Sequence, residues 1–225
     1  MSLKNKILQP WFRFMAGQLS KPHGILAKLT GKKMNESNHS LYRLTLDTMQ
    51  LTDTEQVLEI GFGNGKFFPE LHAQAKDLKL YGVDLSHEMV TEAVKTNTEL
   101  FEKDSLKVSI GDSNDLPFPD NYLDKVFCIN VIYFWEVPED HLNEIHRVLK
   151  PGGHLYCGFR PAETMLQLPF TRFGFRLYDE KDWKQKMKSA NFTDIRSASQ
   201  IDPAIWVGSA KMELGSICIS GKKTA

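Results

Sequence analysis

VLEIGFGNGK, residues 57–66, decides the fold more than any other stretch of this chain. An apolar run carries one acid, Glu59, and then breaks into three alternating glycines, Gly61, Gly63 and Gly65. Glycine allows tight turns and lets a ligand approach the backbone where a side chain would block it. The stretch predicts a strand that delivers a nucleotide-holding glycine loop into a helix. A plain strand–turn–helix corner is the alternative.

From residue 56 onward, short apolar runs alternate with amphipathic stretches of helical spacing. This alternation predicts an α/β fold with a doubly wound, Rossmann-like sheet of about seven strands, mostly parallel with an antiparallel last strand. The region 200–215 contains Pro203 and two glycines, so we expect a loop or a small helix there. The expected strands are 56–60, 79–83, 106–110, 125–130, 154–159, 193–197 and 216–221.

The expected helices lie at 66–75, at 88–101 with Ser86 as its cap, after Pro138, and after Asp179. Residues 1–50 read as an N-terminal helical lid or arm, in which Ser37 or Asn38 opens a helix. Residues 51–225 then form the domain built on the sheet, and the whole chain is expected to be a single structural domain, as suits its length.

Lys and Arg balance Asp and Glu at 28 each among the 225 residues, but unevenly. Seven basic residues precede the first acid, Glu36, so this basic arm suits an acidic substrate, a membrane surface, nucleic acid or simply solvent. The basic residues are Lys4, Lys6, Arg13, Lys21, Lys28, Lys32 and Lys33.

No stretch resembles a signal peptide or a membrane span, which favours a cytoplasmic protein without stable membrane insertion. The three cysteines fall in strand-like runs without zinc spacing, so we expect buried free thiols and no metal.

Polar residues follow four successive expected strands, where ligands of doubly wound sheets bind. The first group is the glycine loop itself. Asp84 ends the second strand, where a carboxylate can accept from both ribose hydroxyls. Asp112 and Ser113 follow the third strand and suit an exocyclic amine such as that of adenine, and Asn130 ends the fourth.

Two other nucleotide-binding classes fit the loop less well. A dinucleotide fingerprint needs glycine at position 66, where the chain has Lys66, and a P-loop needs a G-K-[ST] ending that is missing. Glu59 is awkward beside a pyrophosphate and favourable beside a cation. The loop therefore favours a cationic cofactor.

These motifs resemble those of the class I S-adenosylmethionine-dependent methyltransferases, in particular small bacterial members of the methyltransferase type 11 kind. VLEIGFGNGKF is similar to their first motif and GVDLSHEMV to their second. GDSNDLPFPDNYLDKVFCINVIYFW is similar to their third motif together with the strand that follows it. RVLKPGGHL is similar to the point where their next helix stops and the fifth strand begins. The resemblance covers roughly residues 34–160 and is specific for cofactor and fold, not for substrate.

The resemblance implies S-adenosylmethionine as cofactor and S-adenosylhomocysteine as product. It implies that Glu59 favours the cofactor's positive charge and that Asp84 holds the ribose. The loop glycines would let the backbone approach the methionine and ribose portions, and Asn130 would supply backbone contacts near the amino-acid end. The cofactor residues implied are Glu59, Gly61, Phe62, Gly63, Gly65, Asp84, Leu85 and Met89 against adenine, Asp112 and Ser113 at its edge, and Asn130.

Methyl transfer requires little beyond alignment and exclusion of water, and a base only for an acceptor that is protonated. The sequence accordingly offers no diagnostic catalytic residue. Abundant aromatics near the open end of the sheet favour a small apolar or aromatic acceptor. The candidate pocket residues are Tyr42, Tyr133, Trp135 and Arg160, then Phe134, Trp11, Phe12, Phe170, Phe173, Phe175, Tyr178 and Trp206, with His39, His141 and His146 as candidate bases.

Three alternatives remain open at the level of sequence. The chain could bind the cofactor without catalysis, or act on a quinone- or lipid-like acceptor, because the arm mixes lysines with Trp11, Phe12 and Phe14. A nucleic-acid acceptor is the third, but the chain reads Asn130-Val131-Ile132-Tyr133 where such enzymes carry N-P-P-[YF]. We expect a small-molecule substrate and no nucleic-acid partner.

Overall fold

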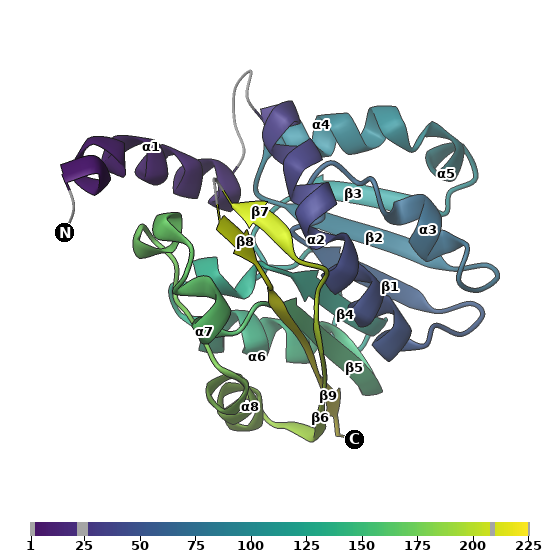
Figure 1. The fold of residues 1–225 in the computed structure, drawn as a ribbon. Coiled ribbons are helices and arrows are strands. Elements are labelled where there is room, and N and C mark those ends of the chain that lie inside the picture. The colour runs from purple at the N-terminus through teal and green to yellow at the C-terminus, as the bar shows by residue number, and fades with distance from the viewer. Residues whose placement is uncertain (1–2, 22–26, 208–209, 225) are drawn as a thin grey trace.

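The computed structural model describes the backbone of residues 3–21, 27–207 and 210–224, and the side chains of 8–21, 38–204 and 212–224. The strands of this described chain form a seven-stranded sheet of order β3-β2-β1-β4-β5-β9-β6 (Figure 1). The first five strands pair in parallel, and β9 is antiparallel to both β5 and β6. The expected mixed sheet with an antiparallel last strand is confirmed. The strands are β1 (Gln56–Ile60), β2 (Lys79–Asp84), β3 (Leu106–Ile110), β4 (Leu123–Ile129), β5 (Leu149–Phe159), β6 (Phe192–Ile201) and β9 (Gly215–Lys223).

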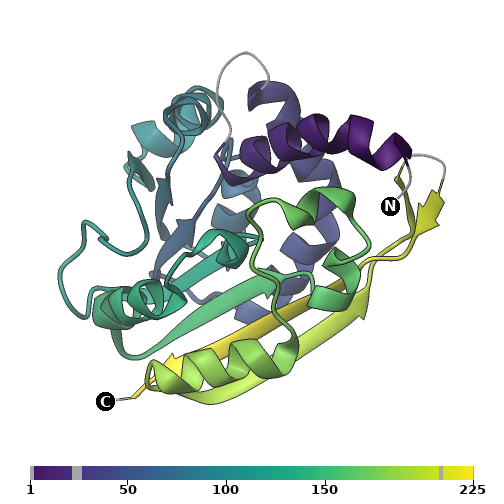
Figure 2. The same cartoon turned by 90° about the vertical axis from the view of Figure 1, so that its left-hand side faces the viewer.

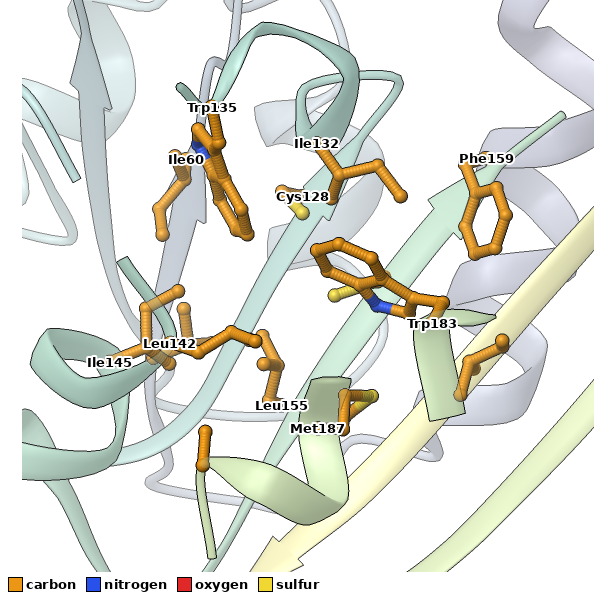
Figure 3. Packing of buried hydrophobic residues seen from close by; sticks show 14 of the residues in the cluster. Ile60, Cys128, Ile132, Trp135, Leu142, Ile145, Leu155, Phe159, Trp183 and Met187 are labelled. Atoms are coloured by element: carbon orange, nitrogen blue, oxygen red, sulfur yellow. The ribbon is translucent and has the colours of Figure 1, made fainter. Parts of the chain in front are cut away.

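Helices cover both faces of the sheet, because successive strand residues point to opposite faces. On one face, α2 (Ala27–Met49), α3 (Phe68–His72), α4 (His87–Thr96) and α5 (Thr98–Glu102) share a core with Val57 and Phe127. On the other face, α6 (Pro138–Val148), α7 (Ala162–Met165) and α8 (Glu180–Ser189) pack against strand residues of the alternate register. Figure 3 shows Trp183 and Met187 of α8 closing this second core beside Leu155.

The predicted helix caps at the sheet are confirmed. The Ser86 side chain accepts from the Met89 N–H at the start of α4, Asp179 accepts from the Asp182 N–H at the start of α8, and Pro138 opens α6. Asn97 divides the expected 88–101 helix into α4 and α5. The region 200–215 differs from the expected loop or small helix: it contains two short strands, β7 (Ile205–Val207) and β8 (Ala210–Met212), that pair antiparallel.

The N-terminal region forms two helices, α1 (Leu3–Ser20) and α2. The expectation that Ser37 or Asn38 opens a helix is wrong, because α2 begins at Ala27 and Asn38 lies inside it. The C-terminal part of α2 is buried against the sheet through Leu41, Thr45 and Met49. Helix α1 instead lies across the short helix η2 (Pro169–Arg172), at the edge of the molecule (Figure 2). The division at residue 50 stays a prediction.

The three cysteines, Cys128, Cys157 and Cys218, are buried free thiols, as expected. Within the described residues, no helix combines the length and apolar character that crossing a membrane requires. The same residues hold no cluster of histidine, cysteine or acidic side chains arranged for a metal ion. The side chains of Trp206 and of the arm residues Lys4, Lys6, Lys28, Lys32 and Lys33 lie outside the described residues.

Candidate active site

A cavity of about 420 Å³ opens at the carboxyl ends of β1, β2, β3 and β4. Strand β1 lies between β2 and β4 in the sheet, so the chain changes direction across the sheet here, as at other ligand sites of this fold class. Leu19 and Ser20 of α1 and Asn38 and Tyr42 of α2 complete the cavity from the N-terminal region. Of the sequence-predicted residues, the cavity is lined by Glu59, Gly61, Phe62, Gly63, Asp84, Leu85, Met89, Asp112, Ser113, Asn130, Tyr42, Trp135, Phe134 and His141.

The three loop glycines have positive φ angles, +69° for Gly61, +60° for Gly63 and +69° for Gly65, but their surroundings differ. A Cβ on Gly61 would collide with Val131, and one on Gly65 would lie 2.7 Å from the Cβ of Ala93 on α4. A Cβ on Gly63 would meet no atom of the described chain within 4 Å and would occupy the cavity. Gly63 therefore keeps space open for a ligand, whereas Gly65, which does not line the cavity, lets α4 pack against the loop.

Asp84 joins the glycine loop to the next helix. Its Oδ2 accepts a hydrogen bond from the Gly63 N–H at 2.9 Å, and its Oδ1 accepts one from the Ser86 N–H at 2.9 Å. Burial raises the pKa of Asp84 to about 6, although both hydrogen bonds act to lower it. Each carboxylate oxygen can accept a second hydrogen bond, so acceptor capacity toward the cavity remains.

Glu59 lies buried beneath the loop, with the Tyr42 hydroxyl donating to its Oε2 at 3.0 Å. Burial raises the pKa of Glu59 to about 8, against the lowering effect of the Tyr42 hydrogen bond, and the nearby charge of Asp84 raises it further. A buried acid of this kind gains stability in its ionised form when a cation arrives beside it. This supports the sequence argument that the loop favours a positive ligand.

The far side of the cavity combines an acid, a hydroxyl and a stacked pair of rings. The Ser113 Oγ lies 2.8 Å from the Nδ1 of His141, and the Asp112 Oδ1 lies 3.6 Å from the same nitrogen. The His141 ring stacks on Trp135 with centroids 4.7 Å apart, and burial lowers the His141 pKa. His141, one of the three candidate bases, is buried in this cluster because α6 packs against the strand ends.

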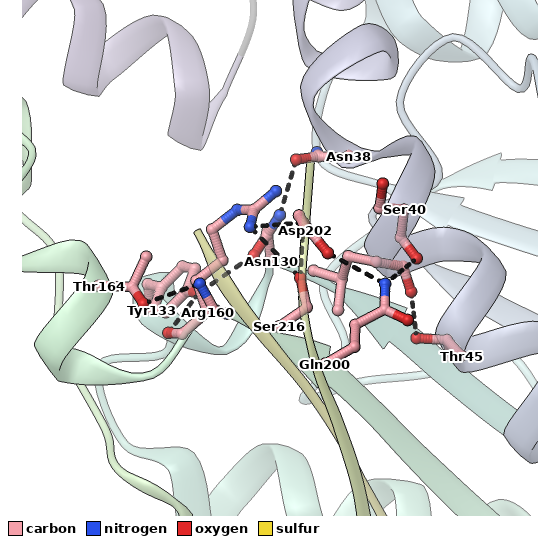
Figure 4. A network of polar contacts seen from close by, with 12 residues as sticks. Asn38, Ser40, Thr45, Asn130, Tyr133, Arg160, Thr164, Gln200, Asp202 and Ser216 are labelled. Atoms are coloured by element: carbon pink, nitrogen blue, oxygen red, sulfur yellow. Dashed lines mark hydrogen bonds and ion pairs between the residues drawn. The ribbon is translucent and has the colours of Figure 1, made fainter. Parts of the chain in front are cut away.

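Asn130 stands at the end of β4 with a φ of +58°. Its Nδ2 donates to the Asn38 Oδ1 at 2.9 Å, and its Oδ1 lies 3.1 Å from the Tyr133 hydroxyl (Figure 4). Asn38 of α2 thus reaches a cavity wall formed by β4. The sequence gives no signal for this pairing, because the two residues are 92 positions apart.

Two predicted pocket residues, Tyr133 and Arg160, lie behind the cavity wall and do not line it among the described residues. The Tyr133 hydroxyl also lies 3.0 Å from the Arg160 carbonyl oxygen. The Arg160 Nη1 donates to the Asp202 Oδ2 at 2.9 Å, and both side chains are about 5% exposed (Figure 4). This buried ion pair joins β5 to the segment after β6.

The other aromatic and basic candidates are spread around the site. Phe170, Phe175 and Tyr178 pack beside the second core, and Trp11 is exposed on α1. His39 is exposed, and His146 lies on α6 against Phe192, outside the lining. Phe12, which is partly buried, and Phe173, which contacts the Arg13 guanidinium, are not among the described lining residues either.

The charged side chains of the lining have one sign. The cavity lining contains five acidic residues and, among the described residues, neither lysine nor arginine. Lys21, next to the lining, lies close enough for its charge to lower the pKa of Asp84. With the open side of Gly63, this acidic lining fits a ligand that carries positive charge and approaches the backbone closely. The acids are Glu59, Asp84, Asp112, Glu136 and Asp140.

Comparison with known proteins agrees with the family resemblance of the sequence motifs and with the observed fold. The family model described as "Methyltransferase domain" matches residues 58–157. The "Uncharacterized methyltransferase YdaC" of Bacillus subtilis is 27% identical over 88% of this chain and 99% of its own length. The "Uncharacterized protein MJ1123" of Methanocaldococcus jannaschii is 30% identical over 75% of this chain and 73% of its own.

Among solved structures, the "Complex between the Haloferax volcanii Trm112 methyltransferase activator and the putative methyltransferase" contains a chain of the same fold. It matches with a TM-score of 0.76 and 23% identity, over 87% of this chain and 93% of that chain. The chain belongs to the class I S-adenosylmethionine-dependent methyltransferase family.

Proposed function

We propose that the cavity holds S-adenosylmethionine and that the enzyme transfers its methyl group, by in-line displacement, to a small uncharged acceptor of apolar or aromatic character. The observation that carries the acceptor class is the lining itself, in which every charged side chain is acidic. Such a lining attracts the positive cofactor and repels an anionic acceptor.

The roles proposed for the cofactor residues follow their places in the cavity. Asp84 would accept from the ribose hydroxyls with the lone pairs left beside its two backbone hydrogen bonds. Leu85 and Met89 would pack on the adenine, and Asp112 with Ser113 would contact its edge. Glu59 would lie on the side of the positive charge, below the open face of Gly63.

The bound cofactor supplies an electrophilic methyl group on a sulfonium, which needs no activation by the protein. The chain's own residues would therefore hold the acceptor in line and exclude water. Leu19 and Ser20 of α1 line the cavity, and this part of the N-terminal region would act as its lid. Asn38 and Asn130 already bond each other, so they form a fixed wall.

The aromatic part of the lining supports an apolar or aromatic acceptor. Tyr42 and Phe67 stack with centroids 4.0 Å apart and line the cavity, as do Phe134 and Trp135. Relatives differ in the acceptors that their names give. A demethylmenaquinone methyltransferase of Symbiobacterium thermophilum is 32% identical over 65% of this chain and 56% of its own length. A phosphoethanolamine N-methyltransferase of Arabidopsis thaliana is 26% identical over 70% of this chain but 32% of its own. The acidic lining favours the uncharged kind.

Two measurements test the proposal. Calorimetry should detect binding of S-adenosylmethionine, and Asp84→Ala should weaken that binding by about tenfold or more, equivalent to about 1.4 kcal/mol. A labelled-methyl screen should then use matched pairs of acceptors, each neutral phenol, quinol or amine beside its phosphorylated analogue. We expect turnover with neutral members of the pairs. Consistent preference for the phosphorylated member would overturn the acceptor class, and unchanged cofactor affinity in Asp84→Ala would overturn the role of Asp84.

A further inference from the structure

Helix α1 presents a row of large apolar side chains to solvent. Leu8 is 44% exposed, Trp11 55% and Phe14 40%, and the rings of Trp11 and Phe14 lie 5.9 Å apart. Ala16, on the opposite side of the helix, is buried, and so is Gln18 in the last turn of α1. Figure 2 shows α1 lying along the edge of the molecule. Contiguous exposed apolar surface of this kind marks an interaction site.

The same region of the sequence is strongly basic. Residues 1–35 contain seven of the 28 Lys and Arg residues and none of the 28 acidic residues, which leaves a net charge of +7 there. The rest of the chain has 28 − 7 = 21 basic residues against 28 acidic, a net charge of −7. The protein is therefore neutral overall but strongly polarised, and an anionic surface would attract its N-terminal side and repel the remainder.

We propose that α1 docks on the surface of an anionic lipid bilayer, with Leu8, Trp11 and Phe14 entering the interfacial region and the net positive charge of residues 1–35 attracted to the headgroups. An amphipathic helix with tryptophan and phenylalanine on one face and positive charge beside it is the composition that lies in a membrane interface. Each basic residue near an anionic surface adds to the attraction. A duplex nucleic acid would use the positive charge but leave the apolar row exposed, so a bilayer accounts for both observations.

The docked helix would bring the cavity close to the bilayer. The last turn of α1 contributes Leu19 and Ser20 to the cavity lining, while its earlier turns carry the exposed apolar row. An apolar acceptor dissolved in the membrane would then enter past α1 without crossing water. This consequence rests on the function proposed above, whereas the docking of α1 does not.

The test is flotation of the full-length protein with vesicles. Vesicles that contain about one third phosphatidylglycerol should carry most of the protein at low salt, and vesicles of phosphatidylcholine alone should carry at least about fivefold less. Raising the salt to about 0.5 M should release the protein from the anionic vesicles, because the Debye length falls to a few ångströms. Equal binding to both vesicle types, or none to either, overturns the proposal.

A variant with its matched control distinguishes vesicle binding by the apolar row from nonspecific hydrophobic binding elsewhere on the surface. Trp11→Ser combined with Phe14→Ser should weaken anionic vesicle binding by about tenfold. Val94→Ser, on α4 and 42% exposed, removes a comparable exposed side chain elsewhere and should leave vesicle binding unchanged. Both variants should bind S-adenosylmethionine like the wild type, so a failure of docking and a failure of the proposed function are distinguishable.

Two other results would assign the row to a different occupant. If the double serine variant abolishes a concentration-dependent dimer in the absence of lipid, and vesicle binding is missing in the wild type, the row is an interface between copies of the chain. If single-stranded RNA binds in a way that depends on Trp11 and Phe14 while vesicles do not bind, the partner is a nucleic acid. Either result overturns docking on a bilayer.

Discussion

Replacing Gly63 by alanine should damage cofactor binding much more than folding. Gly63 has a φ of +60°, and an added Cβ would meet no described atom within 4 Å. The folding cost is therefore limited to the left-handed backbone conformation, about 1 kcal/mol for a non-glycine residue. For a chain of this size, that corresponds to a fall in Tm of about 2–4 °C. The methyl group would occupy the cavity, so we expect the Kd for S-adenosylmethionine to rise by about tenfold or more.

Gly65→Ala is the matched control, because Gly65 has a similar φ of +69° but a closed environment. Its Cβ would lie 2.7 Å from the Ala93 Cβ and 3.0 Å from the Asn97 Nδ2. We expect the same backbone cost plus about 1–3 kcal/mol of overpacking, and hence a larger fall in Tm than in Gly63→Ala. Thermal unfolding and calorimetry with the cofactor provide both quantities. Wild-type cofactor affinity in a folded Gly63→Ala protein, or equal stability of the two variants, would refute the reasoning.

Three further predictions concern the acidic and basic groups around the cavity. Binding of a cation favours the ionised form of Glu59, and because the pKa of Glu59 is about 8, binding releases a proton. The affinity for S-adenosylmethionine should therefore rise as the pH rises toward 8 and then level off. Calorimetry on Glu59→Gln should show a flatter dependence of affinity on pH. Asp84→Asn keeps one acceptor oxygen for two backbone N–H donors, so it should lower the free energy of unfolding by about 1–3 kcal/mol. An unchanged midpoint of urea unfolding would argue against both hydrogen bonds. Arg160→Ala leaves the Asp202 carboxylate buried without its charge partner and should lower the free energy of unfolding by about 3–5 kcal/mol. The double variant Arg160→Met with Asp202→Leu should recover most of that loss. An Arg160→Ala protein of nearly wild-type stability would mean that the pair is not buried in solution.

The glycine loop and Asp84 could be placed from the sequence because their positions depend on local order. A strand, a glycine turn and a second strand twenty residues later fix where the loop and the acid meet, and the sheet brings them together at the Gly63–Asp84 hydrogen bond. The alternation of strands and helices likewise determined the layers of the fold. Their contacts with the cofactor stay predictions.

What the sequence did not reveal depends on contacts between distant segments. Arg160 follows a strand at the open end of the sheet, which favoured a pocket role, but Asp202 pairs with it from 42 positions away. The place of His141 against Trp135 and Ser113 depends on how α6 meets two strand ends. The β7–β8 hairpin was obscured because glycine and proline in that region indicate a turn without indicating which strands flank it.

The attachment of α2 has a consequence for exchanging parts between relatives. Tyr42 bonds the acid beneath the glycine loop, and Asn38 bonds the residue that ends β4, so the floor of the cavity depends on side chains of α2. Helix α1 reaches the cavity through Leu19 and Ser20. A chimaera joined between α1 and α2 would replace the roof and keep the floor intact, whereas one joined at the start of β1 would replace both at once. A junction before α2 would therefore test what α1 contributes to the site without disturbing the residues of α2 that support the glycine loop.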